Sequence, residues 1–354
     1  MGTQVANGER LKISCLVLRR FESCPMHVDG VLVRFGEIGI KSAPVRRQME
    51  ERLRTNIENA LLRRRVEGHV RRLGPRLWMT GPDVAALVDV ATHTFGVVSA
   101  SPATVVDSSM DAMGAAAAKA ALAHDWATFG VRPTRTGEHT YKSQDVGIRV
   151  GSAIYEAAQA AGRSPRVDLD DPDLEVHVEV RDDKAWIMTE KAPGPGGLPL
   201  GSQGKVVVLL SDTASALAAW MMMRRGCAVV PVHAGDTGSI PLELMAALTP
   251  WGLGDDVELL PVCSGTTSKT ALLEAADEVA RSHGALSVVT GETWDSPLSV
   301  HDFAVLRPLC GLDPDEQEHW RRVAEIPHIE GPGLFDEAST ETAGSLLRMR
   351  RTVS

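Results

Sequence analysis

Residues 192–226 read APGPGGLPLGSQGKVVVLLSDTASALAAWMMMRRG. A stretch rich in Gly and Pro precedes a continuous apolar run, Val206 to Leu210, which is followed by the polar loop 211–215 and by helix-forming residues up to Gly226. This order predicts a linker, a buried parallel strand, a tight loop and a helix from Ala216 to Arg225. In an open α/β sheet, phosphate groups bind at such a loop, between the carboxyl end of a strand and the N-terminus of a helix.

The rest of the C-terminal part repeats this alternation of strand and helix. Further strands are predicted at 228–233, 257–262 and 286–290, and further helices at 241–247 and 269–283. Strands that alternate with helices form a parallel sheet covered on both faces. The sequence therefore predicts a doubly wound parallel sheet over residues 203–354.

The N-terminal part has a different pattern. Val31 to Phe35 is predicted as a strand, Lys41 to Arg65 as a helix and Val66 to Trp78 as a second strand, which together indicate a small ferredoxin-like unit. Beyond it, helices are predicted at 113–123 and at 143–160, the latter with Ser143 as N-cap. A hairpin is predicted from strands 174–180 and 185–189.

Composition limits the class of protein. The chain has 354 residues, of which 44% are hydrophobic and 4% aromatic, with a net charge of −9. Its apolar runs are far shorter than the ~20 residues of a membrane span, and its first 25 residues do not read as a secretion signal. Its five cysteines form no CxxC pair, which argues against a metal or disulfide framework. We expect a cytoplasmic protein without a membrane partner.

The charge is distributed unevenly along the chain. Residues 41–76 carry a net charge of +7, whereas residues 77–354 carry −17. A basic block on an acidic protein indicates a polyanionic partner held at one end. The alternative is a solvated helix face on which arginines cluster by chance.

Several motifs stand out along the chain: VLVRFGEIGIKS (31–42), FGVVSASPA (95–103), TRTGEHTYKSQDVGIRVGSAI (134–154), VDLDDPDLEVHVEV (167–180), GGLPLGSQGKVVVLL (196–210), AAWMMMRRGCAVVPV (218–232), TGE (290–292) and VLRPLCGLDPDE (305–316), where a late helix begins. In this order they resemble the tRNA 4-thiouridine synthetases, that is, the tRNA sulfurtransferases of the thiamine biosynthesis family. The resemblance implies an α/β and α+β multidomain protein: a ferredoxin-like unit and a THUMP RNA-binding domain, followed by a doubly wound parallel-sheet domain of the PP-loop type.

The resemblance also implies domain boundaries. We expect a disordered extension over 1–26, the ferredoxin-like domain over 27–80, the THUMP domain over 81–192, a linker over 193–202 and the PP-loop domain over 203–354. The family's N-terminus resembles the sequence that follows Met26, so Met26 competes with Met1 as the true start.

In the family reaction, ATP adenylates a tRNA uridine and a persulfide sulfur then displaces AMP. The resemblance implies ATP with Mg²⁺ as cofactors and a set of nucleotide-binding positions: Leu209, Leu210, Ser211, Ser215, His233, Lys269 and Gly291. The loop departs from the family's SGGxDS pattern. It is one residue shorter, lacks glycine and has Ala214 where an aspartate is expected.

Asp212 stands where the family has glycine, and its carboxylate would repel a polyphosphate unless magnesium intervened. The alternative, which we favour, is that Asp212 is a helix N-cap.

The sulfur-transfer half of the reaction needs a cysteine. The family's cysteine lies in a segment resembling residues 329–335 here, which contain none. We also expect no C-terminal rhodanese domain. Among the cysteines present, Cys263 is the best candidate for a sulfur carrier, because it ends a predicted strand near the ligand edge of the sheet.

Six residues are candidates for tRNA contacts. The resemblance places Lys41, Arg46 and Arg47 near the tRNA backbone, where contacts with phosphates are favourable and salt-sensitive. Arg135, Lys142 and Gln144 lie in a loop that leads into a helix N-terminus, which suits a phosphate. The alternative for Gln144, with Asp145, is simply to cap that helix.

Three functions remain open at this point. The first is a tRNA-binding protein of this family whose thiolation activity is weakened or lost, which we place slightly ahead. The second is an active tRNA sulfurtransferase that takes sulfur from an external donor, such as a cysteine desulfurase. The third is a nucleotide-binding protein of other chemistry. The resemblance further suggests a homodimer.

Overall fold

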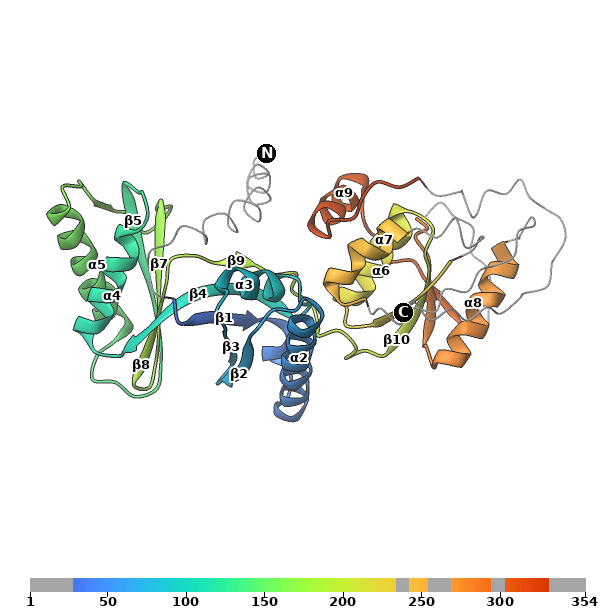
Figure 1. The fold of residues 1–354 in the computed structure, drawn as a ribbon, viewed down its shortest axis with the longest axis horizontal. Helices are drawn as coiled ribbons and strands as arrows, with labels where there is room; N and C mark the ends of the chain where they lie inside the picture. The colour runs from blue at the N-terminus through green and yellow to red at the C-terminus, as the bar shows by residue number, and fades with distance from the viewer. Residues whose placement is uncertain (1–27, 234–241, 254–268, 294–302, 331–354) are drawn as a thin grey trace. The chain divides into compact units, whose positions relative to one another are not determined.

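The computed structural model describes residues 28–233, 242–253, 269–293 and 303–330 (Figure 1). The chain forms two compact units. Of the described residues, unit 1 contains 28–35, 57–92 and 97–194, and unit 2 contains 36–56, 93–96 and those from 195 to 330. The helix α2 (Ala43–Arg63) therefore contributes its last turns to unit 1 and the rest to unit 2. The two units are described separately.

Unit 1 is built on one nine-stranded sheet. The strand order is β2-β3-β1-β4-β8-β7-β5-β6, with β9 also paired to β4. The long strand β4 pairs with β1 through its first part and with β8 through its last residues, so it belongs to both halves of the sheet. The strands are β1 (Gly30–Phe35), β2 (His69–Leu73), β3 (Arg76–Thr80), β4 (Val97–Asp107), β5 (Thr128–Thr136), β6 (Arg166–Val167), β7 (Leu174–Arg181), β8 (Lys184–Met188) and β9 (Ala192–Pro193).

The predicted strand from Val66 to Trp78 is wrong, because the structure has the hairpin β2–β3 there. The chain turns at Gly74, which adopts a positive φ of 57°. Glycine reaches this conformation without steric cost, and Pro75 after it cannot donate to a strand ladder. The predicted hairpin 174–189 is confirmed as β7 and β8.

Helices cover one face of this sheet. The helices α4 (Met110–Leu122) and α5 (Ser143–Ala160) enclose a core with the alternate residues Val176, Val178 and Val180 of β7. The helix α3 (Val84–Thr92) packs beside β4 and β1. Alanines in α4 permit this close packing, and Ser109 caps its first turn by accepting a hydrogen bond from the Ala112 amide.

The sheet of unit 1 curls strongly. Trp78 of β3 and Trp186 of β8 meet edge to face with ring centroids 6.3 Å apart, although β1 and β4 lie between their strands. Three strand spacings would separate them by about 14 Å in a flat sheet. Both indoles are buried in a small cluster with Leu32, Ala103 and Met188, on the face opposite the α4–α5 core.

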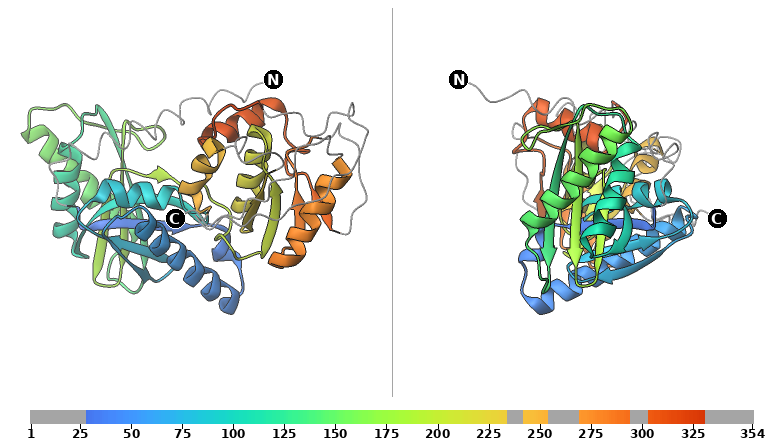
Figure 2. Two further views of the ribbon diagram at one scale, coloured as in Figure 1. Left: turned by 45° about the vertical axis from the view of Figure 1, so that its right-hand side comes forward. Right: turned by 90° about the vertical axis from the view of Figure 1, so that its left-hand side faces the viewer.

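Unit 2 contains the predicted doubly wound parallel sheet, which is confirmed in the order β11-β10-β12-β13. Figures 1 and 2 show α6 and α8 on opposite sides of its strands. The predicted strand 257–262 lies outside the described residues. The elements are η2 (Glu37–Ile40), β10 (Lys205–Leu209), α6 (Thr213–Arg224), β11 (Ala228–Val232), α7 (Leu242–Leu248), η3 (Thr249–Trp251), α8 (Lys269–His283), β12 (Ser287–Val289), β13 (Ala304–Leu306) and α9 (Pro314–Val323).

The central strand β10 supplies two cores with alternate side chains. Val206 and Val208 pack with α6, α7 and Trp251, whereas Val207 and Leu209 pack with α8. This explains why the run from Val206 to Leu210 is apolar at every position rather than at alternate ones. Burial on both faces fixes the strand, and with it the loop that follows.

The predicted linker is held against the end of α6. The Leu198 amide donates to the Arg224 carbonyl at 3.0 Å, and the Gln203 amide donates to the Gly226 carbonyl at 3.0 Å. Gly197 has a positive φ of 74°, and a Cβ there would lie 2.1 Å from the Arg224 oxygen. Only glycine allows this approach.

Candidate functional site

The candidate site lies where β10 ends and α6 begins. The helix starts at Thr213, earlier than predicted, and Asp212 is its N-cap. The Asp212 carboxylate accepts a hydrogen bond from the Ser215 amide at 2.7 Å. The N-cap interpretation of Asp212 is thus confirmed.

Ser215 closes the loop from the other side. Its Oγ accepts hydrogen bonds from the amides of Ser211, at 2.9 Å, and Asp212, at 3.0 Å, and donates to the Asp212 carbonyl at 2.8 Å. Ser211 and Ser215 are both buried. Three amides of the loop are therefore engaged within the loop itself, and a phosphate held there would compete for them with Ser215 Oγ and the Asp212 carboxylate.

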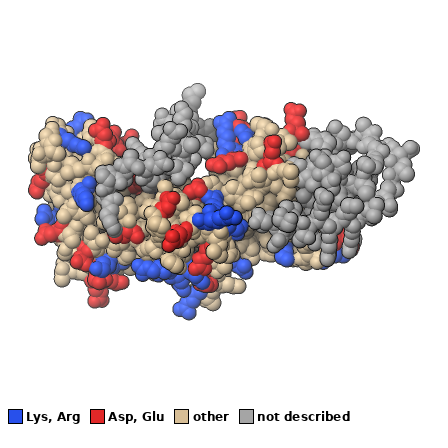
Figure 3. All heavy atoms as spheres, in the orientation of Figure 1, with Lys and Arg blue, Asp and Glu red and all other residues tan. Residues whose placement is uncertain are grey.

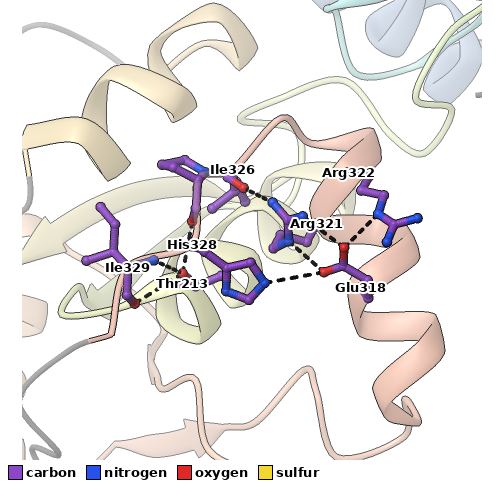
Figure 4. Close-up of polar contacts among 8 residues, drawn as sticks. Thr213, Glu318, Arg321, Arg322, Ile326, His328 and Ile329 are labelled. Atoms are coloured by element: carbon purple, nitrogen blue, oxygen red, sulfur yellow. Dashed lines mark hydrogen bonds and ion pairs between the residues drawn. The ribbon is translucent and has the colours of Figure 1, made fainter. Parts of the chain in front are cut away.

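A segment after α9 lies against the same loop (Figure 4). The Thr213 amide donates to the Ile329 carbonyl at 3.2 Å, and the Ile329 amide donates to Thr213 Oγ1 at 2.7 Å. The Thr213 hydroxyl also lies 2.9 Å from the Pro327 carbonyl. Residues 326–329 are thereby tied to the first turn of α6.

The end of α9 is fixed by one carboxylate. Glu318 accepts hydrogen bonds from Arg321 Nε and Arg322 Nε, both at 2.6 Å, and His328 Nε2 lies 3.7 Å from it (Figure 4). The hydrogen bond from Arg321 lowers the pKa of Glu318 to about 2. Arg321 also donates to the Ile326 carbonyl, which connects this carboxylate to the segment over the loop. The late helix begins at Pro314, within the predicted stretch 305–316, with Asp313 as its N-cap. The strand β13 before it was not predicted from the sequence.

On the sheet side, Gly291 packs directly on the loop. A Cβ at Gly291 would lie 2.4 Å from the Ser215 amide nitrogen. The next residue, Glu292, is buried and pairs with Arg307 at 3.2 Å, while Thr290 Oγ1 donates to it at 3.1 Å. This pairing holds the ends of β12 and β13 together.

The remaining predicted nucleotide-binding positions lie around the strand ends. Leu209 and Leu210 are buried in opposite cores, so only their backbone faces the loop. His233 is buried, with Nδ1 2.9 Å from the Leu210 carbonyl. Lys269 is the first residue of α8.

Known protein families and relatives match segments in both the N-terminal and the C-terminal part of the chain. Family models match residues 30–101 (ThiI ferredoxin-like domain), 108–190 (THUMP domain) and 201–243 (Thiamine biosynthesis protein, ThiI). A "probable tRNA sulfurtransferase" of Halobacterium salinarum is 38% identical over 292 residues, covering 76% of this chain and 74% of that protein. One of Methanothermobacter thermautotrophicus is 32% identical over 333 residues, covering 82% and 83%. The chain belongs to the tRNA sulfurtransferase (ThiI) family.

Two solved structures share the fold of this tRNA sulfurtransferase family member. PH1313 from Pyrococcus horikoshii has a TM-score of 0.69 at 28% identity, covering 82% of this chain and 97% of that one. A structure described as a 4-thiouridine synthetase–RNA complex with bound ATP has a TM-score of 0.70 at 24% identity, covering 85% and 86%. The expected ferredoxin-like, THUMP and parallel-sheet architecture is thus confirmed. Within the described ranges, none of the helices has the length and apolar character of a membrane span.

The cysteines that the structure describes differ in their burial. Cys227 is buried, and burial raises the pKa of its thiol, so it is unsuited to carrying sulfur. Cys310 is partly exposed, with Sγ 3.9 Å from the Glu292 carbonyl. Cys263, the predicted carrier, lies outside the described residues and stays a prediction.

Three of the predicted tRNA contacts lie around the start of α2 in unit 2. Lys41 follows η2, and its amide donates to the Ile38 carbonyl at 3.2 Å. Arg47 is exposed, whereas Arg46 lies 3.9 Å from the buried Glu50 carboxylate. Of the two arginines, Arg47 is therefore the more accessible to a ligand.

The other three lie before and within α5 in unit 1. Arg135 donates to the Gly137 carbonyl at 3.0 Å and contacts His139, so its guanidinium is partly used by its own loop. Lys142, not Ser143 as predicted, is the N-cap, because Ser143 already has helical geometry and Asp145 accepts from the Lys142 amide at 2.7 Å. Gln144 is exposed and lines an apolar groove of about 540 Å³ beside α5. Capping is therefore done by Asp145 and leaves Gln144 available.

Proposed function

We propose that this protein binds tRNA and that its inherited ATP-dependent thiolation of a uridine is weakened or lost. The carrying observation is the self-capped loop. Ser215 Oγ and the Asp212 carboxylate engage the amides of Ser211, Asp212 and Ser215 at 2.7–3.0 Å. A polyphosphate would have to displace these contacts before it could be held.

The electrostatics of the loop support this proposal. The N-terminus of a helix attracts an anion, and the Asp212 carboxylate already occupies that position at α6. A second anion there would meet like charge at short range, which is unfavourable unless a cation such as Mg²⁺ lies between them. The Thr213–Ile329 contacts further occupy the first turn of the helix.

The RNA side of the proposal rests on charge and on the family. Residues 41–76 carry a net charge of +7, and Figure 3 shows Lys and Arg gathered, among some carboxylates, along the lower side of the molecule where Figure 1 draws β2 and β3. A solved neighbour is a 4-thiouridine synthetase–RNA complex. We assign tRNA contacts to Lys41, Arg46 and Arg47 and to Arg135, Lys142 and Gln144.

We further assign RNA binding to domains at 27–80 and 81–192, and the nucleotide-type fold to 203–354, joined by a linker at 193–202 and preceded by an extension at 1–26. A cytoplasmic homodimer accords with the same family resemblance.

An active tRNA sulfurtransferase is the second candidate. The close approach of Gly291 to the Ser215 amide favours it, because glycine keeps side-chain atoms out of the space between the strand end and the loop that would hold the nucleotide. In that case ATP would bind through the backbone of Leu209, Leu210, Ser211 and Ser215, with His233, Lys269 and Gly291 beside it. An external donor such as a cysteine desulfurase would supply sulfur, with Cys263 as carrier.

Calorimetry on the purified protein tests the two candidates. We expect tRNA binding that is unaffected by ATP, and no heat of ATP–Mg²⁺ binding with or without unmodified tRNA. ATP binding in the micromolar range would overturn the proposal and favour the active enzyme. Asp212→Gly is the matched variant: it removes the carboxylate from the helix N-terminus, so a gain of ATP affinity would show that self-capping is the block.

A further inference from the structure

A second cluster of charges lies in unit 1, far along the sequence from the loop. Arg34 of β1, Arg76 of β3 and Arg181 of β7 surround Glu179 of β7. Arg34 Nη2 lies 3.5 Å from Glu179, Arg76 Nε lies 3.4 Å from it, and Arg181 Nε donates to it at 3.0 Å. We call these four residues the Glu179 cluster.

The curl of the sheet brings the residues of the Glu179 cluster together from strands that are not neighbours in the sheet. Four strand spacings separate β3 from β7 in the sheet order, which would place them about 19 Å apart if the sheet were flat. The contact between Arg76 and Glu179 therefore bridges the two halves of the sheet. It is made on the face that carries Trp78 and Trp186, opposite the core of α4 and α5.

The charges in this cluster do not balance. Three guanidiniums, which stay protonated at any physiological pH, face one carboxylate, so the local net charge is +2. The register of β1 and β3, with Val33 opposite Leu77, puts Arg34 opposite Arg76, and like charges in this position repel. Burial, opposed by Glu179, lowers the pKa of Arg34, and Arg76 and Arg181 add to the lowering.

Arg76 is the cation of the cluster that solvent reaches most. Its Nη1 donates to the Pro75 carbonyl at 3.0 Å, and its buried Nε, 3.4 Å from Glu179, has no hydrogen-bond acceptor among the described residues. The Arg76 and Arg34 side chains keep 27% and 17% of their surface exposed, whereas Glu179 keeps 7%. Arg34 already donates to Ser101 Oγ at 2.9 Å and to Met188 Sδ at 3.0 Å, so Arg76 is the cation of the cluster that can take a second anion.

We propose that the Glu179 cluster is a phosphate site, which in the proposed function holds one backbone phosphate of the bound tRNA. Planar guanidiniums with several N–H groups match the geometry of a phosphate oxygen pair. A bound phosphate would neutralise the excess charge and accept hydrogen bonds from the exposed part of the Arg76 guanidinium. This inference rests on the proposed tRNA binding for its RNA ligand, but not for the phosphate chemistry of the site.

Arg76→Gln is the variant that tests the site. Glu179 keeps Arg34 and Arg181 as partners, so the fold should survive, which a thermal melt checks. We expect tRNA affinity at about 0.15 M salt to fall roughly three- to tenfold. The slope of log K against log salt should lose about 0.7 to 0.9, the value of one phosphate contact. Arg281→Gln, at an exposed ion pair of α8, is the control and should change neither.

Glu179→Gln distinguishes a phosphate site from a purely structural clasp. It raises the local charge to +3, so a phosphate site should bind tRNA as tightly or more tightly, with a steeper salt slope. A structural clasp would instead lose stability without any gain in the slope. If Arg76→Gln unfolds the protein, Arg76→Lys, which keeps the charge, should fold and weaken binding less.

Inorganic phosphate distinguishes the source of the ligand. We expect phosphate to raise the melting temperature of the wild type but not of Arg76→Gln, and to compete with tRNA. Protection by phosphate with unchanged tRNA affinity in Arg76→Gln would overturn the RNA assignment and leave a site for a free anion. If the wild type binds no tRNA, the proposed function fails, and the phosphate melt alone decides the site. Unchanged melts and unchanged RNA affinity would overturn the inference.

Discussion

Asp212 and Ser215 show how two side chains can fill a loop that is shaped to hold a ligand. Asp212 accepts a hydrogen bond from the Ser215 amide, which a glycine at position 212 would leave open, and Ser215 Oγ accepts one from the Ser211 amide. An N-cap aspartate typically stabilises a helix by about 0.5–2 kcal/mol relative to alanine. The loop therefore gains stability from the same contacts that compete with a phosphate, and stability and nucleotide binding oppose each other at these residues.

Gly291→Ala tests how tightly the loop is packed. The added Cβ would lie 2.4 Å from the Ser215 amide nitrogen and 2.6 Å from the Ala214 carbonyl carbon, and backbone cannot move aside as a side chain can. We expect the substitution to destabilise unit 2 by about 1–3 kcal/mol, as overpacking does. Denaturant unfolding followed by tryptophan fluorescence measures it.

Gly311→Ala is the matched control, since a Cβ there has no atom within 4 Å among the described residues. Its effect should stay within about 0.5 kcal/mol, as at ordinary surface positions. Equal effects at the two glycines would show that Gly291 has room, and would remove its support for an active enzyme.

At the residue scale, local contacts could be predicted and distant ones could not. The Asp212 carboxylate accepts a hydrogen bond from an amide only three residues away, a spacing that is visible in the sequence. Ile329 reaches Thr213 across 116 residues, and Arg34 reaches Glu179 across 145. Contacts of that separation depend on the topology of the sheets, which the order of elements alone does not determine.

At the element scale, α9 matters because it ends next to the segment that covers the loop. Its last turn depends on Glu318, whose hydrogen bonds with Arg321 and Arg322 need the ionised carboxylate. Since the folded pKa is about 2 and the ordinary value is 4.5, the stabilisation is fully present above pH 4.5 and is lost as the pH falls toward 2.

Glu318→Gln should therefore lower the melting temperature at pH 6 and lower it much less at pH 2.5, where most of the stabilisation has been lost. Melting curves of the wild type and the variant at several pH values measure this. A difference that stays constant from pH 6 to pH 2.5 would mean that the charge of Glu318 does not stabilise α9. The ion pairs of Glu318 with Arg321 and Arg322 are partly exposed, so added salt should reduce the difference at pH 6.

Elements with a strong pattern were predicted well. The helix α8 has the predicted bounds, and β10 and α6 differ by a few residues at their ends. The pattern failed where a short turn interrupts a strand, as at Gly74 between β2 and β3. It also failed for β13, whose three residues are too few to show a period.

At the scale of the whole molecule, charge is the property that sequence predicts most directly. The double variant Arg46→Glu with Arg47→Glu changes the charge of the basic block by four. We expect tRNA affinity to fall at least tenfold at about 0.15 M salt, with a shallower salt slope, because contacts with phosphates release counterions. Fluorescence anisotropy with labelled tRNA measures both.

Glu274→Gln with Glu278→Gln on α8 is a control for general effects of charge, since it changes the net charge in the opposite direction outside the basic block. Its effect on affinity should be small. If the arginine double variant binds as tightly as the wild type, the start of α2 faces away from the RNA and the basic block has another role.

The strand β4 has a consequence for how such proteins can be recombined. The two N-terminal family models end and begin at residues 101 and 108, yet β4 runs from Val97 to Asp107 and pairs with β1 on one side and β8 on the other. A fragment cut at residue 108 would expose the edge of β8 to pairing with other chains. A THUMP module transplanted into a new host would thus need a host strand in the register of β4. The segment that could be transferred as a folded piece is therefore larger than the segment matched by the THUMP family model.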